Sequence, residues 1–258
     1  MEWKIIHIDE TDSTNRWLKE GLAADDSGLT QTMVDVGVRK SPLSSAAINI
    51  AVVADYQTAG RGCGTNMWES ERGKNLLFSL LIHPTVISAN EQFRITEAVS
   101  VAICQTLQPY LAQRVEIKWP NDIYVDDRKI CGILIENRLQ GSTIKDSIIG
   151  IGLNVNQREF KSDAPNPVSL YQLIGKETDL EALLKAFLAA FDDAFNSKTT
   201  YFTYRERLYR RLKYGTYATK TSCFTARLMD VLSDGRLMLV DKDGQERLYA
   251  FKEIQFII

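Results

Sequence analysis

The sequence has few of the residues that metal sites and nucleophilic active sites need. Its 258 residues include 2 histidines and 4 cysteines, the latter being Cys63, Cys104, Cys131 and Cys223. The cysteines form no Cys-x-x-Cys pair, which argues against a zinc site and predicts reduced thiols in the cytoplasm. Both histidines, His7 and His83, border apolar strands, where packing is a commoner role than catalysis. No Ser/His/Asp or Cys/His arrangement stands out.

Long apolar runs and a strong net charge are also missing. No run is long enough to cross a membrane, and residues 1–6 are strand-like without the basic start of a signal peptide. The formal net charge is −2, which gives no electrostatic reason to expect nucleic acid as the main partner. We therefore expect a cytoplasmic protein that binds neither DNA nor membrane.

Hydrophobic periodicity predicts an α+β domain over residues 1–213 and a small β-barrel over residues 214–258. The predicted strands are 3–8, 32–38, 48–55, 75–82, 115–118, 123–125, 130–135 and 148–153. The predicted helices follow 12–15 and span 88–111, 179–195 and 199–212, with Ser88 and Glu91 as a capping box. After Lys213, short segments alternate with the turn signals 233–235 and 241–244, which is typical of a small barrel.

Several segments rich in glycine or polar residues follow apolar strands. Residues 12–15 either cap a helix or bind a polar ligand through hydroxyl and NH groups. In residues 58–68, glycines surround Arg61, so the segment is a wide turn or a loop that follows an anionic ligand closely. It has neither the Walker pattern nor the full dinucleotide-binding spacing. The arginine fork suits a phosphate or a carboxylate.

A second group of residues suggests where such a ligand would lie. Lys118, Asn121 and Asp122 surround Trp119-Pro120 at a strand end, either as a turn with a salt bridge or as a site for phosphate and Mg²⁺. Lys129 introduces the next apolar strand. The strand glycines, Gly132, Gly150 and Gly152, indicate close approach by another group, and Asn154 follows them. Together these features indicate a flat ligand on a sheet beside an anionic centre.

The ordered set of motifs at residues 12–15, 57–62, 118–123, 129–136 and 150–156 resembles biotin–protein ligases. The order and spacing match over roughly residues 5–175. The resemblance implies a mixed sheet flanked by helices, similar to class II aminoacyl-tRNA synthetases, and an SH3-like barrel at residues 214–258. It also implies that biotin and MgATP form biotinyl-5′-AMP and pyrophosphate. The biotinyl group then passes to a lysine of a biotin carboxyl carrier protein.

The resemblance also implies site residues. Those implied to bind biotin are Ser13, Thr14, Asn15, Gln57, Gly60, Arg61, Gly62, Cys63, Lys129, Gly132, Gly150 and Gly152. Those implied to bind ATP and the adenylate are Arg61, Trp68, Lys118, Asn121, Lys129 and Asn154. Those implied to serve catalysis are Arg61, Lys118, Asp122 and Lys129. Mg²⁺ is expected mainly on the ATP phosphates, with Asp122 as an additional ligand or as the group that orients the acceptor lysine.

Two departures from the family pattern lead to further expectations. Cys63 stands where the family often has a basic or long polar residue, so an adenylate contact is either missing or supplied by the backbone. The motif at residues 12–15 leaves no room for the N-terminal DNA-binding domain of some members, so we expect no repressor function. A lipoate–protein ligase of related fold and a non-catalytic binding protein are the alternatives, and a homodimer is left open.

Overall fold

A computed structural model describes residues 1–27, 49–64, 66–162 and 165–258. Their contacts form two compact units, each described here by itself. The first unit comprises Met1–Ala89 and Ile130–Leu184, and the second comprises Asn90–Lys129 and Lys185–Ile258. The predicted strand at 32–38 lies outside the described residues.

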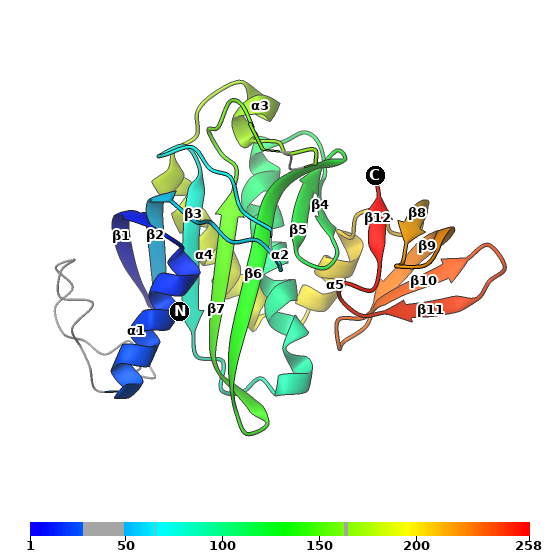
Figure 1. Ribbon diagram of the computed structural model, residues 1–258, viewed down its shortest axis with the longest axis horizontal. Coiled ribbons are helices and arrows are strands. Elements are labelled where there is room, and N and C mark those ends of the chain that lie inside the picture. Colours follow the sequence, from blue (N-terminus) through cyan, green and yellow to red (C-terminus); the bar gives the residue numbers. More distant parts are fainter. Residues whose placement is uncertain (28–48, 65, 163–164) are drawn as a thin grey trace. The chain divides into compact units, whose positions relative to one another are not determined.

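The first unit is built on a mixed sheet with the order β1-β2-β3-β7-β6 (Figure 1). Its strands are β1 (Trp3–Thr11), β2 (Asn49–Gln57), β3 (Leu76–Ile82), β7 (Thr143–Leu153) and β6 (Arg128–Gln140). β1 and β2 pair in parallel, and the other neighbours pair antiparallel. Every residue of β3 is buried, because this apolar strand lies in the middle of the sheet.

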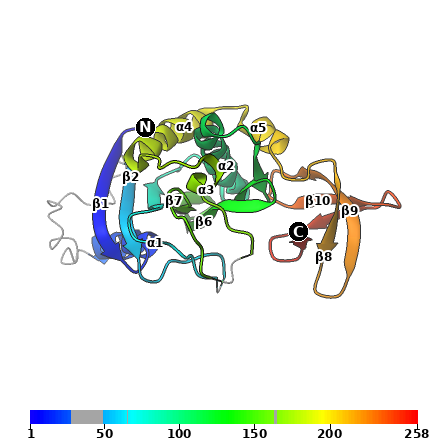
Figure 2. The same cartoon turned by 90° about the horizontal axis from the view of Figure 1, so that it is seen from above.

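Helix α1 (Thr14–Ser27) packs on one face of this sheet (Figure 2). Leu18 and Leu22 point into a core that they share with Ile6, Val52 and Ile148. Their spacing of four residues puts both leucines on one side of the helix, which fixes α1 by hydrophobic burial. The same packing holds the first residues of α1 beside the ends of β1 and β2.

The second unit combines helices with a hairpin. Its elements are α2 (Phe93–Leu107), β4 (Val115–Lys118), β5 (Asp122–Val125), α5 (Thr200–Glu206) and two 3-10 turns, Ala89–Glu91 and Gln108–Tyr110, the first beginning in the first unit. β4 and β5 pair antiparallel, with Lys118 opposite Asp122. The rings of Phe93 in α2 and Tyr204 in α5 meet edge to face, with centroids 5.6 Å apart.

A separate five-stranded antiparallel sheet completes the second unit. Its strands are β8 (Tyr214–Ala218), β9 (Cys223–Val231), β10 (Leu237–Asp241), β11 (Glu246–Tyr249) and β12 (Gln255–Ile257), in the order β11-β10-β9-β8-β12. The sheet begins at Tyr214, but β11 and β12 are not paired within the described residues. A closed SH3-like barrel and a domain boundary after residue 213 therefore stay predictions.

The mixed sheet with helices confirms the coarse α+β expectation, but some local predictions were wrong. The helix predicted over 88–111 is divided, because a 3-10 turn spans Ala89–Glu91 and α2 begins at Phe93, with an N-cap, Gln92, that makes no side-chain cap hydrogen bond. The capping box at Ser88 and Glu91 stays a prediction. The helix predicted over 199–212 ends at Glu206, after which Leu208 bridges to Ile117. Helix α4 (Leu180–Asn196) agrees with expectation, whereas the short helix α3 (Leu170–Ile174) was not predicted.

Glu97 gives helix α2 a pH-dependent contribution to stability. Its side chain is buried, and burial raises its pKa from 4.5 to about 7, against the opposing effect of Arg94. Because the folded pKa is raised, the favourable contribution of the neutral acid is complete below pH 4.5 and is lost as the pH rises through 7. The loss amounts to about 3 kcal/mol at full ionisation.

We expect Glu97→Gln to remove most of the fall in unfolding free energy between pH 4.5 and pH 7. Glutamine does not ionise, so the unfolding free energy of the Glu97→Gln protein should change little with pH in that window. Urea unfolding at several pH values measures this, with the exposed substitution Glu246→Gln as the matched control. Equal pH slopes for the Glu97→Gln protein and the unmodified protein would contradict the assignment.

Candidate ligand site

The first turn of α1 brings polar side chains into the interior of the first unit. Ser13, Thr14 and Asn15 are 4%, 3% and 3% exposed. The Thr14 backbone N–H donates to Gln57 Oε1 at 2.8 Å, and the Thr14 hydroxyl donates to the same oxygen at 3.1 Å. Gln57 Oε1 is therefore held by the helix start. Its Nε2 lies 3.3 Å from the point that a Cβ at Gly60 would occupy.

A chain of hydrogen bonds continues from Thr14 into the sheet. Thr14 Oγ1 and Ser79 Oγ are 2.6 Å apart, and Ser79 Oγ donates to Asn15 Oδ1 at 2.6 Å. Asn15 Nδ2 donates to Glu136 Oε2 at 3.1 Å and to the Leu134 carbonyl at 3.3 Å. Each polar atom of the Asn15 side chain therefore has a partner inside the protein, as burial requires.

The glycine-rich loop forms a narrow two-stranded turn. Its start is fixed to the end of β1, because the Thr58 and Ala59 N–H groups donate to the carbonyls of residues 11 and 12 at 2.9 and 3.0 Å. Further along, Trp68 N–H donates to the Gly60 carbonyl at 2.9 Å, and Gly62 N–H donates to the Asn66 carbonyl at 2.8 Å. A Cβ at Gly60 would lie 2.8 Å from the Trp68 carbonyl oxygen, so only glycine fits there.

Glycines in β7 leave room for two side chains from elsewhere. A Cβ at Gly152 would lie 2.4 Å from Cε2 of the Trp68 ring, and one at Gly150 would lie 2.3 Å from Asn15 Oδ1. Gly152 is also the antiparallel partner of Gly132 in β6. The strand glycines thus form a flat floor on which the indole of Trp68 rests, as the spacing of glycines in the sequence indicated.

The charged groups at this site in the first unit centre on Glu136. Its Oε1 lies 3.8 Å from Arg61 Nη1 and 3.4 Å from Lys19 Nζ. The Arg61 side chain is 48% exposed, so it keeps donors available for an anionic ligand. Cys63, further along the loop, carries a free, half-buried thiol.

The second unit contains a cluster of one carboxylate and two ammonium groups. Lys129 Nζ lies 2.6 Å from Asp122 Oδ1, and Lys118 Nζ lies 4.0 Å from Asp122 Oδ2. The ammonium of Lys118 also lies 5.1 Å from the ring centre of Tyr124 and 5.3 Å from that of Phe256. Burial lowers the pKa of Lys118, and although Asp122 counteracts this effect, Lys129 reinforces it. A bound anion would raise the pKa of Lys118 again.

Backbone geometry defines the turn between Lys118 and Asp122. The Trp119–Pro120 peptide bond is cis, and Trp119 Nε1 donates to the Gly235 carbonyl at 2.9 Å. The side chain of Trp119 is buried, so this residue serves packing, while Lys118 and Asp122 are only partly buried. Asn121 lies in the same turn.

Asn154 follows β7 and is held by its surroundings. Its backbone N–H donates to the Ile130 carbonyl at 2.9 Å, and its Nδ2 donates to the Val168 carbonyl at 3.1 Å. Its Oδ1 is buried and has no hydrogen-bond partner within the described part of the chain. A ligand N–H donor near this atom would satisfy it.

Sequence reasoning left Ser79 and Glu136 out of the site set, although both belong to the buried chain. Ser79 is the only polar residue of the apolar strand β3, and it is fully buried. Glu136 follows the apolar segment 130–135 in β6. A hydroxyl inside an otherwise apolar strand was the available signal, because such a group needs a partner when buried.

Within the described residues, no group of three or more His, Cys, Asp or Glu side chains is arranged to hold a metal ion. Asp122 is the single carboxylate among the charges of its cluster, and Lys129 already contacts it. Mg²⁺ is usually held by one or two carboxylates together with substrate phosphates. This donor set alone does not fit a resident Mg²⁺.

Comparison with known proteins shows which class of protein the chain is similar to. Residues 28–154 match the biotin/lipoate A/B protein ligase family. The biotin protein ligase of Aquifex aeolicus, solved with biotin and ATP, has the same fold, with a TM-score of 0.75, 23% identity and 98% coverage of both chains. Over these residues the chain is similar to this ligase family.

Individual curated proteins show which ligases of this class the chain is similar to. The bifunctional ligase/repressor BirA of Bacillus subtilis is 30% identical over 210 residues, which are 77% of this chain and 64% of that protein. The biotin–[acetyl-CoA-carboxylase] ligase of Paracoccus denitrificans is 31% identical over 147 residues, or 54% of this chain and 60% of that protein. The chain is thus similar to biotin–protein ligases and spans less than two thirds of these relatives.

Among the described helices, none is long and apolar enough to cross a membrane.

The contact between Trp68 and Gly152 can be tested by a double-mutant cycle. We expect Gly152→Ala to cost about 1–3 kcal/mol of unfolding free energy, because its methyl group overlaps the indole. In a Trp68→Ala background the same substitution should cost little, since the overlapping ring is gone. Urea unfolding of the four proteins measures the coupling. Gly215→Ala is the control, because its Cβ would meet neighbours no closer than 3.4 Å. Additive costs in the cycle would contradict the contact.

Proposed function

We propose that the protein is an ATP-dependent biotin–protein ligase. It joins biotin to the α-phosphate of MgATP, forming biotinyl-5′-AMP with loss of pyrophosphate, and then transfers the biotinyl group to a lysine of a biotin carboxyl carrier protein with release of AMP. The observation that carries the proposal is the buried polar set of Thr14 and Gln57 beside a glycine floor. The similarity to biotin–protein ligases over 77% of the chain supports it.

The first unit is assigned to the biotin part of the ligand. Because Gln57 Oε1 accepts from the Thr14 N–H, its Nε2 remains as a donor for the ureido oxygen. Gly132, Gly150 and Gly152 are assigned to the slot for the fused rings, with Asn15 seated against Gly150 and the Trp68 indole against Gly152. Ser13, Gly60 and Gly62 are assigned to the walls of the biotin site.

The charged groups are assigned to the adenylation step. The biotin carboxylate must attack a phosphate although both are anionic, so positive charges lower the barrier by neutralising the developing charge. Arg61, Lys118 and Lys129 are the residues assigned to this charge. Trp68, Asn121 and Asn154 are assigned to the adenylate. The loop at 58–74 would order over it and exclude water.

The transfer step needs an acceptor lysine that has lost its proton. Asp122 is assigned to orient that lysine or to take its proton, because it is the carboxylate of the ammonium cluster. The carboxyl carrier partner, the SH3-like form of the second sheet and the absence of repressor function also belong to this proposal. Cys63 would supply no charged contact to the adenylate, in contrast to the basic or long polar residue often found there.

Exchange of labelled pyrophosphate into ATP tests the reaction. With MgATP present, we expect biotin to stimulate exchange and lipoate to give none, because the site is assigned to a cyclic urea. Mass spectrometry of the quenched mixture identifies the acyl-AMP. Lipoyl-AMP in place of biotinyl-AMP would favour a lipoate ligase, and binding of biotin without exchange would favour a non-catalytic binding protein. Either result would overturn the proposal.

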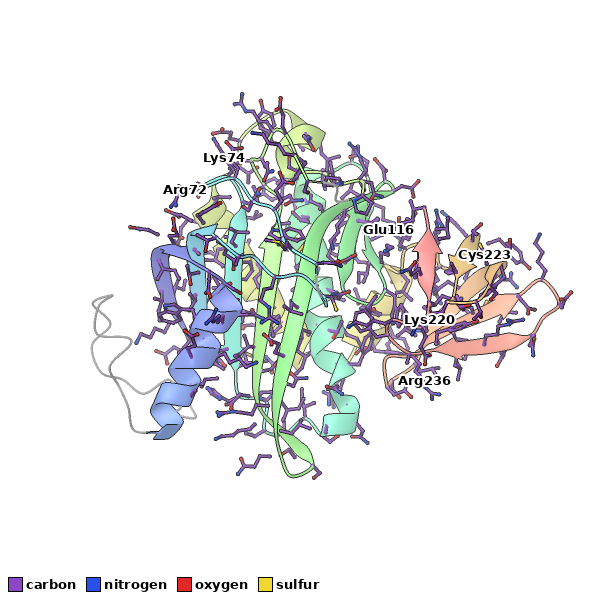
Figure 3. All side chains as sticks on the ribbon, in the orientation of Figure 1. Arg72, Lys74, Glu116, Lys220, Cys223 and Arg236 are labelled. Atoms are coloured by element: carbon purple, nitrogen blue, oxygen red, sulfur yellow. The ribbon has the colours of Figure 1, made fainter. Side chains whose placement is uncertain are left out.

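Charge removal tests the assigned residues. We expect Lys129→Ala and Arg61→Ala each to lower the rate of adenylate formation by about 100-fold or more, because each removes a stabilising charge from the transition state. The matched controls are Lys220→Ala and Arg236→Ala, whose side chains lie on turns of the five-stranded sheet (Figure 3). Near-normal rates in either site variant, with unchanged thermal unfolding, would place the site elsewhere.

A further inference from the structure

Two segments of the first unit, residues 68–75 and residues 154–162, are joined by hydrogen bonds. The innermost bond involves the buried side chain of Asn75, whose Oδ1 accepts from the Val155 N–H at 2.9 Å. A buried hydrogen bond of this kind is costly to break, because the freed polar groups have no access to water. The inner end of the contact is therefore part of the folded interior.

Gln157 extends the contact outward. Its side chain is buried, and its Oε1 accepts from the Glu71 N–H at 3.2 Å. Its Nε2 lies 3.5 Å from Glu69 Oε1. One side-chain amide of the second segment thus reaches two residues of the first segment.

Glu69 forms the outer end of the contact. Its two oxygens accept from consecutive backbone groups, Oε1 from the Lys161 N–H and Oε2 from the Ser162 N–H, each at 2.8 Å. Burial would raise the pKa of Glu69, but the hydrogen bonds from Ser162 and Lys161 outweigh this effect and lower the pKa. The carboxylate is therefore ionised near neutral pH. Hydrogen bonds to an ionised acceptor are about twice as strong as those between neutral groups.

The position of Glu69 connects this contact to the ligand site. Glu69 directly follows Trp68, whose N–H donates to the Gly60 carbonyl at 2.9 Å and whose indole rests against Gly152. The segment that Glu69 binds begins with Asn154. Because Trp68 and Asn154 are both assigned to the adenylate, Glu69 joins the two segments that carry them.

We propose that Glu69 is a positioning residue that holds these two segments together around bound biotinyl-5′-AMP and thereby slows its release. It acts through the backbone of residues 161–162 and does not touch the reacting atoms. The bonds of Asn75 and Gln157 are buried, so the segments separate first at the outer end, where Glu69 lies. By linkage, an adenylate that this contact retains must strengthen the contact to the same extent. This inference rests on the proposed function.

Glu69→Gln tests the contact. The amide keeps the size of the side chain but replaces one acceptor oxygen by an NH₂ group, which would face a backbone N–H donor. The matched control is Glu159→Gln, which makes the same change of charge at an exposed side chain of the second segment. Thermal unfolding of both variants identifies any general loss of structure.

The first readout is the release of biotinol-5′-AMP, an analogue in which CH₂ replaces the acyl carbonyl so that no lysine can be acylated. The labelled complex is diluted into an excess of unlabelled analogue, and the remaining bound label gives the dissociation rate. We expect Glu69→Gln to raise this rate about tenfold, because bonds to an ionised acceptor are lost. The rate for Glu159→Gln should stay near that of the unmodified protein.

The second readout is hydrogen exchange of the amides of Lys161 and Ser162, which a purely structural role of Glu69 would not couple to the ligand. In the unmodified protein, biotinol-5′-AMP should slow this exchange, because ligand and contact stabilise each other. In Glu69→Gln the ligand should slow it much less, since the acceptor of these amides is altered.

A second variant keeps the test decisive if Glu69→Gln does not fold. Lys161→Pro removes one of the two N–H donors, so it should also speed release, and it should add little in the Glu69→Gln background. If the folded variants match the unmodified protein in release rate and in exchange, the role of Glu69 is overturned. If the unmodified protein does not bind biotinol-5′-AMP, the proposed function itself fails.

Discussion

The hydrogen bond from the Thr14 backbone to Gln57 Oε1 is the interaction on which the candidate site depends. It joins residues 43 positions apart, the start of α1 and the end of β2. Parallel pairing of β1 with β2 puts Thr11 opposite Gln57, so the chain entering α1 passes the glutamine. Burial of Leu18 against the sheet then holds the helix in place. The Thr14 hydroxyl donates to the same oxygen, so backbone and side chain together fix the orientation of the Gln57 amide.

The rest of the site follows from limits on space and on buried polarity. Glycines in β7 allow Asn15 and Trp68 to approach the sheet more closely than any other residue would permit. Asn15 is then buried, so its amide needs partners, and Ser79 and Glu136 supply them. Close approach and hydrogen-bond satisfaction therefore determine which atoms remain available to a ligand. The ammonium cluster around Asp122 is built separately, on the β4–β5 hairpin and on Lys129, which follows it.

Local sequence patterns predicted the parts of the fold that depend on strand periodicity. The apolar run at 75–82 contains β3, the strands at 3–8 and 148–153 were recovered within longer elements, and the strand at 48–55 was recovered from residue 49 onward. Helix ends were predicted less well. Ser88 is followed by a 3-10 turn rather than by α2 itself, and it bridges to Thr143, a pairing that no local pattern contains. Leu208 similarly leaves helical geometry to pair with Ile117.

The same difference between local features, which the sequence predicts, and long-range contacts, which it does not, holds for the candidate site. The strand glycines predicted close approach, because a missing Cβ has a local meaning, and Trp68 and Asn15 do approach there. The role of Ser79 depends on residues 64 and 65 positions away, so it emerged only from the three-dimensional arrangement. The family resemblance predicted which residues belong to the site, whereas the structure shows which atoms donate and which accept in the hydrogen bonds among them.

A crystal structure of the protein with biotin tests the central claim most directly. The account predicts that the ureido oxygen accepts from Gln57 Nε2 and that a ring nitrogen donates to Thr14 Oγ1, each within about 3.2 Å. It also predicts that Gln57 Oε1 still accepts from the Thr14 backbone. A ureido ring bound away from these atoms, or a Gln57 amide turned so that Oε1 faces the ring, would contradict it.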